Sequence, residues 1–213
     1  AEVDFFTDAN PSRESYSVYA QTTYSLADAF RIVSGLRYSE DTFTTDVTNF
    51  LNVESFQEEG TTDEITSRVV AEVDFSEDLM GYFALAKGFK PGGSNLTFGF
   101  DDDNAPPMVF PTFEAETVDS VEFGLKSTFA DGAARANIAV FSYTYENLQF
   151  QATDPDIYRG GVANIPESEM SGLEIEFTGF LTDSLSLDMN LAFLDSEVTS
   201  DYEVLDNVDA YPY

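Results

Sequence analysis

The sequence contains no cysteine and no histidine among its 213 residues. Disulfide bonds, zinc sites built from these residues, cysteine or histidine nucleophiles and histidine general bases are therefore excluded together. Because this removes most of the common catalytic machinery, we predict a protein that is not an enzyme and that has no catalytic residues, resident metal or cofactor. The first ten residues lack the basic and apolar regions of a signal peptide, so we expect the chain to be a fragment or a processed piece.

Basic residues are also scarce. Nine Lys and Arg stand against 40 Asp and Glu, which gives a formal net charge of −31. Such a chain cannot replace the cations condensed around a phosphate backbone, so nucleic-acid binding is not expected. No run of about 18 uncharged apolar residues exists, which excludes a transmembrane helix. A transmembrane β-barrel stays open, because its alternating strands dilute apolar residues with polar ones.

A repeat of about fifty residues organises the chain. Asp28, Asp78, Asp131 and Asp183 lie among small or polar residues at intervals of 50, 53 and 52 (78 − 28, 131 − 78, 183 − 131). Each is flanked by alternating stretches and therefore predicts a hairpin tip. The predicted hairpins pair strands 14–24 with 29–39, 64–75 with 79–89, 117–129 with 133–147, and 168–178 with 185–196. Long loops are expected at 40–63, 90–116 and 148–167, and short turns opposite long loops are typical of outer-membrane barrels.

The two faces of these strands differ in polarity. Residues such as Val69, Leu125, Ile175 and Leu187 fall on a face that is apolar in nearly every strand. Lys or Arg facing lipid at the bilayer midplane costs about 2–4 kcal/mol, so charged residues should face the lumen. The expected lumen-facing set is Arg31, Arg37, Arg68, Glu72, Lys87, Glu122, Lys126, Arg135, Glu174 and Glu176. The acids that fall on the apolar face lie near the long loops, where strand ends would stand above the membrane; they are Glu14, Asp119, Glu146, Glu169 and Asp195.

Aromatic residues mark the turn end of each hairpin. Tyr24, Phe75, Phe129 and Phe177 all lie on the apolar face within a few residues of a short turn. Aromatic rings at that depth match the interfacial girdle of a membrane barrel, although ordinary core aromatics would give the same pattern. We predict a girdle because the feature recurs in all four hairpins.

Two predicted strands fit the alternation less well. Both faces of 79–89 are apolar, and the polar face of 133–147 also carries Phe141 and Tyr143. These inward aromatic residues, together with Tyr82, are expected to pack against something that fills the lumen.

Several loop and lumen residues could contact a ligand. Phe98, Phe100, Phe110, Phe113 and Tyr158 are candidates for ligand contact, or they serve only to order the loops. The acidic loops could attract cations, but solubility explains them more simply. Calcium binding at 101–104 and acid–base chemistry at Glu174 and Glu176 are weaker alternatives, because the first lacks EF-hand spacing and the second is an ordinary pattern of solvated charge.

Five groups of short segments follow one another in a fixed order along residues 18–196. They are Tyr19-Ala20-Gln21 with Gly35-Leu36-Arg37-Tyr38, Gly88-Phe89-Lys90-Pro91-Gly92-Gly93, Glu116-Thr117 with Glu122-Phe123-Gly124-Leu125-Lys126, the stretch from Phe141 to Gln149, and Ser171-Gly172-Leu173-Glu174-Ile175-Glu176. Together they resemble the β-barrel of TonB-dependent outer-membrane receptors.

The resemblance implies an all-β, antiparallel up-and-down barrel of about 22 strands, of which residues 1–213 would supply about eight without the plug domain. It also implies an outer-membrane receptor that takes up a scarce nutrient, with an iron–siderophore complex as the first candidate. The implied partners are the TonB energising complex, reached through the plug region, the nutrient and the membrane lipid. The alternatives are a passive porin and a soluble β-rich adhesion or binding module.

Overall fold

The computed structural model describes residues 7–49, 54–95, 112–154, 159–182 and 184–201. These residues form strands joined by turns. The strands are β1 (Thr7–Ala27), β2 (Phe30–Asn49), β3 (Glu54–Ser76), β4 (Leu79–Lys90), β5 (Gly93–Ser94), β6 (Thr112–Phe113), β7 (Glu116–Phe129), β8 (Ala134–Asp154), β9 (Arg159–Thr182) and β10 (Leu185–Val198). Within the described ranges, no helix is long and apolar enough to cross a membrane.

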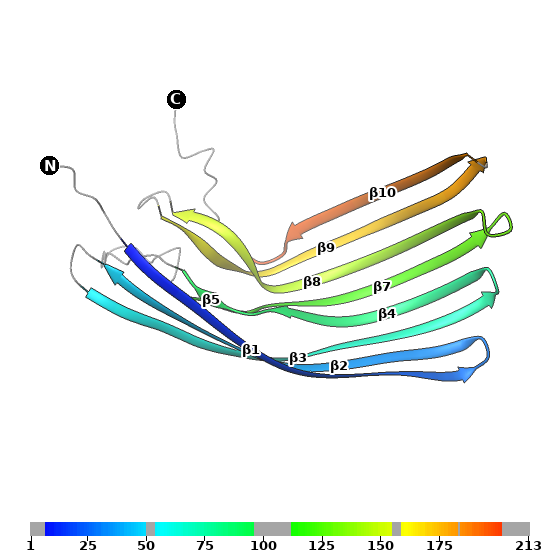
Figure 1. The fold of residues 1–213 in the computed structure, drawn as a ribbon. Helices are drawn as coiled ribbons and strands as arrows, with labels where there is room; N and C mark the ends of the chain where they lie inside the picture. The colour runs from blue at the N-terminus through cyan, green and yellow to red at the C-terminus, as the bar shows by residue number, and fades with distance from the viewer. Residues whose placement is uncertain (1–6, 50–53, 96–111, 155–158, 183, 202–213) are drawn as a thin grey trace, which may run out of the picture.

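Eight of the strands form one antiparallel sheet in the order β1-β2-β3-β4-β7-β8-β9-β10. Each long strand pairs with the strands that precede and follow it, apart from the short β5 and β6, which pair only with each other. The ribbon curves from β1 to β10 like a section of a cylinder wall (Figure 1). The predicted up-and-down arrangement of four antiparallel hairpins is therefore confirmed.

Three of the short turns lie where the aspartate repeat predicts them, and Asp183 lies outside the described residues. Asp28 and Asp78 connect β1 to β2 and β3 to β4, and Asp131 lies between β7 and β8. The turn at Asp131 needs left-handed backbone at three consecutive residues, with φ of 55° at Ala130, 53° at Asp131 and 85° at Gly132. Glycine and aspartate tolerate that conformation better than most residues, which explains the Asp-Gly pair at this position.

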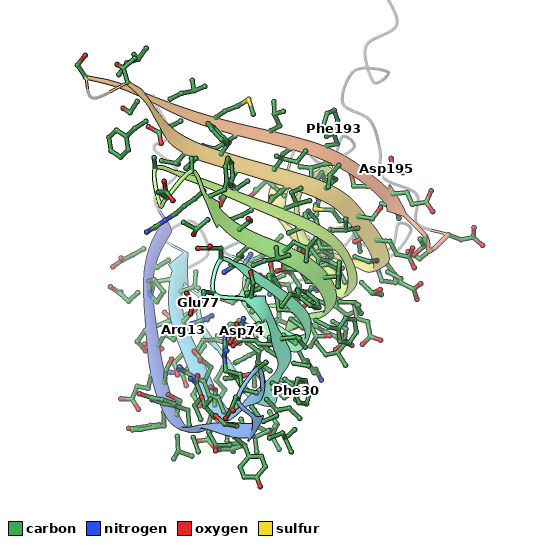
Figure 2. The ribbon with its side chains drawn as sticks, turned by 90° about the vertical axis from the view of Figure 1, so that its right-hand side faces the viewer. Arg13, Phe30, Asp74, Glu77, Phe193 and Asp195 are labelled. Carbon is green, nitrogen blue, oxygen red and sulfur yellow. The ribbon has the colours of Figure 1, made fainter. Side chains whose placement is uncertain are left out.

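The strand register confirms the predicted apolar face. Because directly paired residues share a face of the sheet, one row can be followed across all eight strands. That row is Tyr24, Ile32, Ala71, Phe83, Phe123, Val140, Leu173 and Phe193. Figure 2 shows Phe30 and Phe193 on the convex side of the sheet and Arg13 and Asp74 on the concave side.

The convex face has no protein layer over it within the described residues. Large apolar side chains on this face are exposed, with Val18 at 68% and Phe193 at 62% exposure, whereas few hydrophobic residues are buried. A water-soluble domain rarely leaves so large an apolar surface uncovered. Near the turns, Tyr24 and Phe75 stay exposed, and the rings of Phe129 and Phe177 lie 6.2 Å apart on neighbouring hairpins. These rings have the position of the predicted girdle.

A collar of carboxylates bounds the apolar band at its loop end. Glu40 pairs with Asp63, Asp119 with Lys87, and Glu169 with Glu197, all on the convex face. Between this collar and the turns, the apolar stretches of the outermost strands and of β3 cover 16–24, 185–193 and 65–75. Each matches the roughly 9–11 residues that a tilted β-strand needs to span a bilayer.

The strands continue well beyond the predicted strand ends. Much of 40–63, expected as loop, belongs to β2 and β3, which stay paired out to Asn49 and Glu54. Likewise β8 and β9 stay paired to Asp154 and Arg159, within the expected loop 148–167. The prediction of long loops was wrong in these two places, because backbone pairing continues above the apolar band.

Candidate functional site: the concave face

The concave face brings most of the expected lumen-facing residues together. The register puts nine of them on the face opposite the apolar row. From β2 to β9 they are Arg31, Arg37, Arg68, Glu72, Glu122, Lys126, Arg135, Glu174 and Glu176. Whether they contact a ligand or a plug stays a prediction.

Lys87 fits this arrangement less simply. Its backbone position, paired with Ser67 on β3 and with Asp119 on β7, belongs to the convex face by register. Its Nζ atom lies 3.4 Å from a carboxylate oxygen of Glu64, at the point where β3 and β4 stop pairing. Glu64 pairs with Ser39 on the concave face, so the amino group of Lys87 reaches a residue of that face, and the lumen-facing role of Lys87 stays a prediction.

Arg31 is the centre of an ion cluster near the turns. It contacts Glu72 through Nε and Asp74 through Nη1, the latter at 2.5 Å, and all three side chains are roughly two-thirds or more buried. Since Glu72 pairs directly with Arg31 across the strands, the guanidinium can reach both carboxylates from one position. The cluster links β2 to β3 on the concave side.

We expect Arg31→Met to destabilise the folded barrel by about 1–2 kcal/mol, because two neighbouring carboxylates would lose their shared cation in a partly screened site. Guanidinium unfolding of the complete protein in liposomes would measure the change. Arg135→Met is the matched control, since Arg135 makes no ion pair among the described residues. Equal destabilisation by both substitutions would contradict a specific role for the cluster.

A second polar group lies on β4 and β7. The Tyr82 hydroxyl donates a hydrogen bond to Glu122 at 2.5 Å, and the Lys126 Nζ atom lies 5.4 Å from the centre of the Tyr82 ring. Lys126 and Arg135 line a hollow of about 880 Å³ at the turn end, together with Asp74 and Asn137. The hollow therefore presents charges of both signs toward the interior of the curve.

The inward aromatic residues have partners within the sheet itself. The Tyr82 ring covers Gly124, and the Phe141 ring lies 2.6 Å from where a Cβ of Gly172 would stand. Phe141 also stacks on Tyr143 with ring centres 4.7 Å apart. Each glycine thus provides the space for an aromatic ring from the neighbouring strand, an arrangement that fills gaps in β-sheets. The sequence had indicated that these aromatic residues pack against something in the lumen. The structure shows that they also pack against glycines of the neighbouring strands.

The remaining candidates divide between described and undescribed residues. Phe98, Phe100, Phe110, Tyr158 and the acidic stretch 101–104 lie outside the described residues. Phe113 lies in β6, where its ring packs against Gly93. Glu176 accepts a hydrogen bond from Asn137 at 3.0 Å and, like Glu174, is exposed. The described residues contain no group of three or more carboxylates placed to hold a metal ion.

Sequence reasoning missed a polar junction at the loop end of the concave face. There, Arg13 on β1 and Thr45 on β2 hydrogen-bond to residues that follow β4, and Gln149 on β8 does the same from the other side. The two adjacent glycines Gly92 and Gly93 were the available signal, because both are buried where the chain folds inward.

The family is decided by comparison with known proteins. The model of the family described as "TonB dependent receptor-like, beta-barrel" matches residues 3–212. The chain belongs to this family. Its members are outer-membrane β-barrel receptors, and the uncovered apolar convex face described above is what that location requires.

Individual relatives agree with this assignment. The pesticin receptor of Yersinia enterocolitica is 28% identical over 200 residues, covering 90% of this chain and 27% of the receptor. The probable TonB-dependent siderophore receptor PiuA of Acinetobacter baumannii is 28% identical over 197 residues, covering 90% of this chain and 25% of that protein. The chain thus spans about a quarter of the length of these relatives.

A solved structure has the same fold. The crystal structure of the ferric yersiniabactin uptake receptor FyuA from Yersinia pestis superposes with a TM-score of 0.74 at 22% identity, covering 92% of this chain and 28% of that one. The sheet of this TonB-dependent receptor chain therefore corresponds to one section of a larger closed barrel.

Proposed function

We propose that this chain forms part of the wall of an outer-membrane receptor that takes up a siderophore-type nutrient, with a ferric siderophore complex as the first candidate. The observation that carries the proposal is the family match along nearly the whole chain. The names of relatives support the substrate class: one is a probable siderophore receptor, and the structural neighbour is a ferric yersiniabactin uptake receptor.

The division of charge between the two faces supports the same function. An apolar convex face allows the wall to lie in lipid, while the concave face presents Arg68, Lys126 and Arg135 to whatever occupies the interior. We propose that the energy for uptake comes from TonB, through a plug region that these residues surround. We further propose that the role is transport and binding without catalysis, since the matching family is one of receptors.

A passive porin is the competing function, since porins also have polar lumens. The family match favours the receptor over the porin, because the matching family consists of TonB-dependent receptors. A direct comparison of energised and de-energised cells separates the two functions.

The test is uptake of radiolabelled iron by cells that lack their own siderophore receptors and express the complete receptor containing these residues. Supplied with ferric yersiniabactin and other ferric siderophores in turn, cells should accumulate iron from at least one of them only when tonB is intact. Accumulation that is equal with and without tonB would support the porin. Absence of accumulation from every complex would remove the siderophore assignment.

A further inference from the structure

Two short segments beside the β4–β7 hairpin fold onto the concave face at its loop end. They are Lys90–Asn95, which contains β5, and Thr112–Glu116, which contains β6, and we call them together the arm. Gly93 pairs with Phe113 and Ser94 with Thr112, so the two segments run side by side. The sequence had predicted an external loop here.

One end of the arm is attached to β1 and β2. The guanidinium of Arg13 donates a hydrogen bond to the carbonyl oxygen of Gly92 at 2.6 Å. The hydroxyl oxygens of Thr45 and Ser94 are 2.8 Å apart, and Thr45 is only 3% exposed. Both contacts involve side chains that point to the concave side, so the arm lies inside the sheet at this place.

The other end is attached to β8 and β9. The side-chain amide of Gln149 lies 2.9 Å from the carbonyl oxygen of Pro91, 3.1 Å from that of Glu114 and 3.3 Å from that of Lys90. Asn164 both accepts from the backbone N–H of Glu114 and donates to its carbonyl, at 2.8 and 3.1 Å. One glutamine side chain therefore holds both segments of the arm, because its nitrogen carries two N–H groups.

The arm is closely packed as well as hydrogen-bonded. A Cβ atom on Gly92 would stand 2.5 Å from the carbonyl oxygen of Phe113, and one on Gly93 would stand 2.7 Å from the Phe113 ring. The two glycines allow this approach: a larger residue at Gly92 would have to move the backbone, and one at Gly93 would have to displace the Phe113 ring. The arm thus connects β2 to β9, although β3, β4, β7 and β8 separate these strands in the sheet.

We propose that the arm is a fixed inner rim that narrows the loop-end mouth of the barrel, and that Gln149 is the residue that positions it. The role as a rim for a transported ligand rests on the proposed function. A hinged lid would be joined to the wall at one end, whereas this segment is hydrogen-bonded to the wall at both ends and tightly packed between them. The rim limits the size of solute that reaches the concave face.

A disulfide lock tests whether the arm is fixed. Thr45→Cys with Ser94→Cys introduces a pair whose parent oxygens are already in contact, in a chain that has no other cysteine. In the complete receptor the bond should form under mild oxidation, and uptake of ferric yersiniabactin, or of whichever ferric complex the uptake test identifies, should be the same before and after reduction. An uptake rate about tenfold lower in the oxidised form and restored by reductant would show that the arm must move, and would overturn the proposal.

The positioning role of Gln149 is tested without any transported substrate. Gln149→Glu keeps the shape of the side chain but replaces its N–H groups with a carboxylate facing three carbonyl oxygens. Loss of these hydrogen bonds should slow formation of the 45–94 disulfide about fivefold to tenfold. Gln151→Glu is the matched control, because it makes the same charge change at an exposed position on the same strand.

A size-dependent label measures the rim itself. Met170 on β9 pairs with Tyr143 on the concave face. With Met170→Cys as the only cysteine of the chain, a small and a bulky maleimide are applied to intact cells, and the ratio of their labelling rates is compared. Gln149→Glu should raise the ratio of bulky to small label about fivefold or more, while Gln151→Glu should leave it unchanged. Migration of the unheated receptor on a denaturing gel verifies that each variant is folded. Equal ratios in the two folded variants would overturn the role of Gln149, whatever the outcome of the uptake test.

Discussion

Arginine in place of Leu191 is expected to destabilise the folded barrel by about 2–4 kcal/mol, the cost of a basic side chain facing lipid near the bilayer midplane. Leu191 lies on β10, pairs with Ile175 and stands 45% exposed in the middle of the convex apolar band. Equilibrium unfolding of the complete receptor in liposomes, at matched lipid composition, measures the free energy.

Asn190→Arg provides the control for this substitution. Asn190 is adjacent in sequence but lies on the concave face, where it pairs with Glu176. Arginine there meets water and a carboxylate, so the free energy of unfolding should change little. If both arginines were tolerated equally, Leu191 would not face lipid, and the assignment of the convex face to the membrane would be wrong.

Alanine in place of Gly124 should destabilise the barrel by about 1–3 kcal/mol, because an added methyl group would overlap the Tyr82 ring. Gly124 is buried and Tyr82 is directly opposite on β4. To make room, the ring must swing away and lose its hydrogen bond to Glu122. The unfolding free energy of the complete receptor again gives the magnitude.

Gly35→Ala is the control for Gly124→Ala. It also replaces a strand glycine with alanine, but without a steric overlap, so it measures the effect of the glycine itself on the free energy of unfolding. Around Gly35, the nearest atom to an added Cβ is 3.8 Å away, an ordinary contact distance. This substitution should therefore be neutral or slightly stabilising, because alanine restricts the unfolded chain more than glycine does. Similar losses at Gly124 and Gly35 would mean that the Tyr82 ring does not depend on the glycine.

The hairpins could be predicted from the sequence because they depend on local information. The turns at Asp28, Asp78 and Asp131 combine residues that favour tight turns with alternation on both sides, and the alternation is strong wherever one face meets lipid. The same reasoning put nine of the ten charged candidates at positions that the register gives to the concave face. Lys87 lies in strand 79–89, which is apolar on both faces, so the alternation there gives no clear direction.

The outer halves of the long strands were missed because the lipid no longer imposes a pattern there. Above the collar, β2 and β3 pair through polar residues such as Thr42 with Thr61, whose hydroxyls lie 3.0 Å apart. Backbone hydrogen bonds and threonine side chains maintain the sheet, but a search for apolar alternation ends at the first carboxylate. Threonine favours strands, and that weaker propensity was the available signal.

The junction at the arm depends on contacts between residues far apart in the chain. Gln149 lies 58 positions from Pro91, and Arg13 lies 79 from Gly92. Such contacts depend on the curvature of the sheet and on the bend of its long strands. Neither can be predicted from the residues that are adjacent in the sequence. The residues next to Gln149 in the sequence gave no sign that its side chain would hold two backbone segments.

The abrupt change from apolar residues to carboxylates on the convex face fixes the depth of the barrel. Sliding the wall toward the turns by one pair of residues, about 6–7 Å along a strand, would draw the side chains of Glu40, Asp119 and Asp195 into hydrocarbon. Sliding it the other way would pull the Tyr24 and Phe75 rings out of the opposite interface. The apolar band therefore sets the hydrocarbon thickness that the protein requires. A bilayer of a different thickness must thicken or thin next to the wall, while the position of the wall along the membrane normal stays the same.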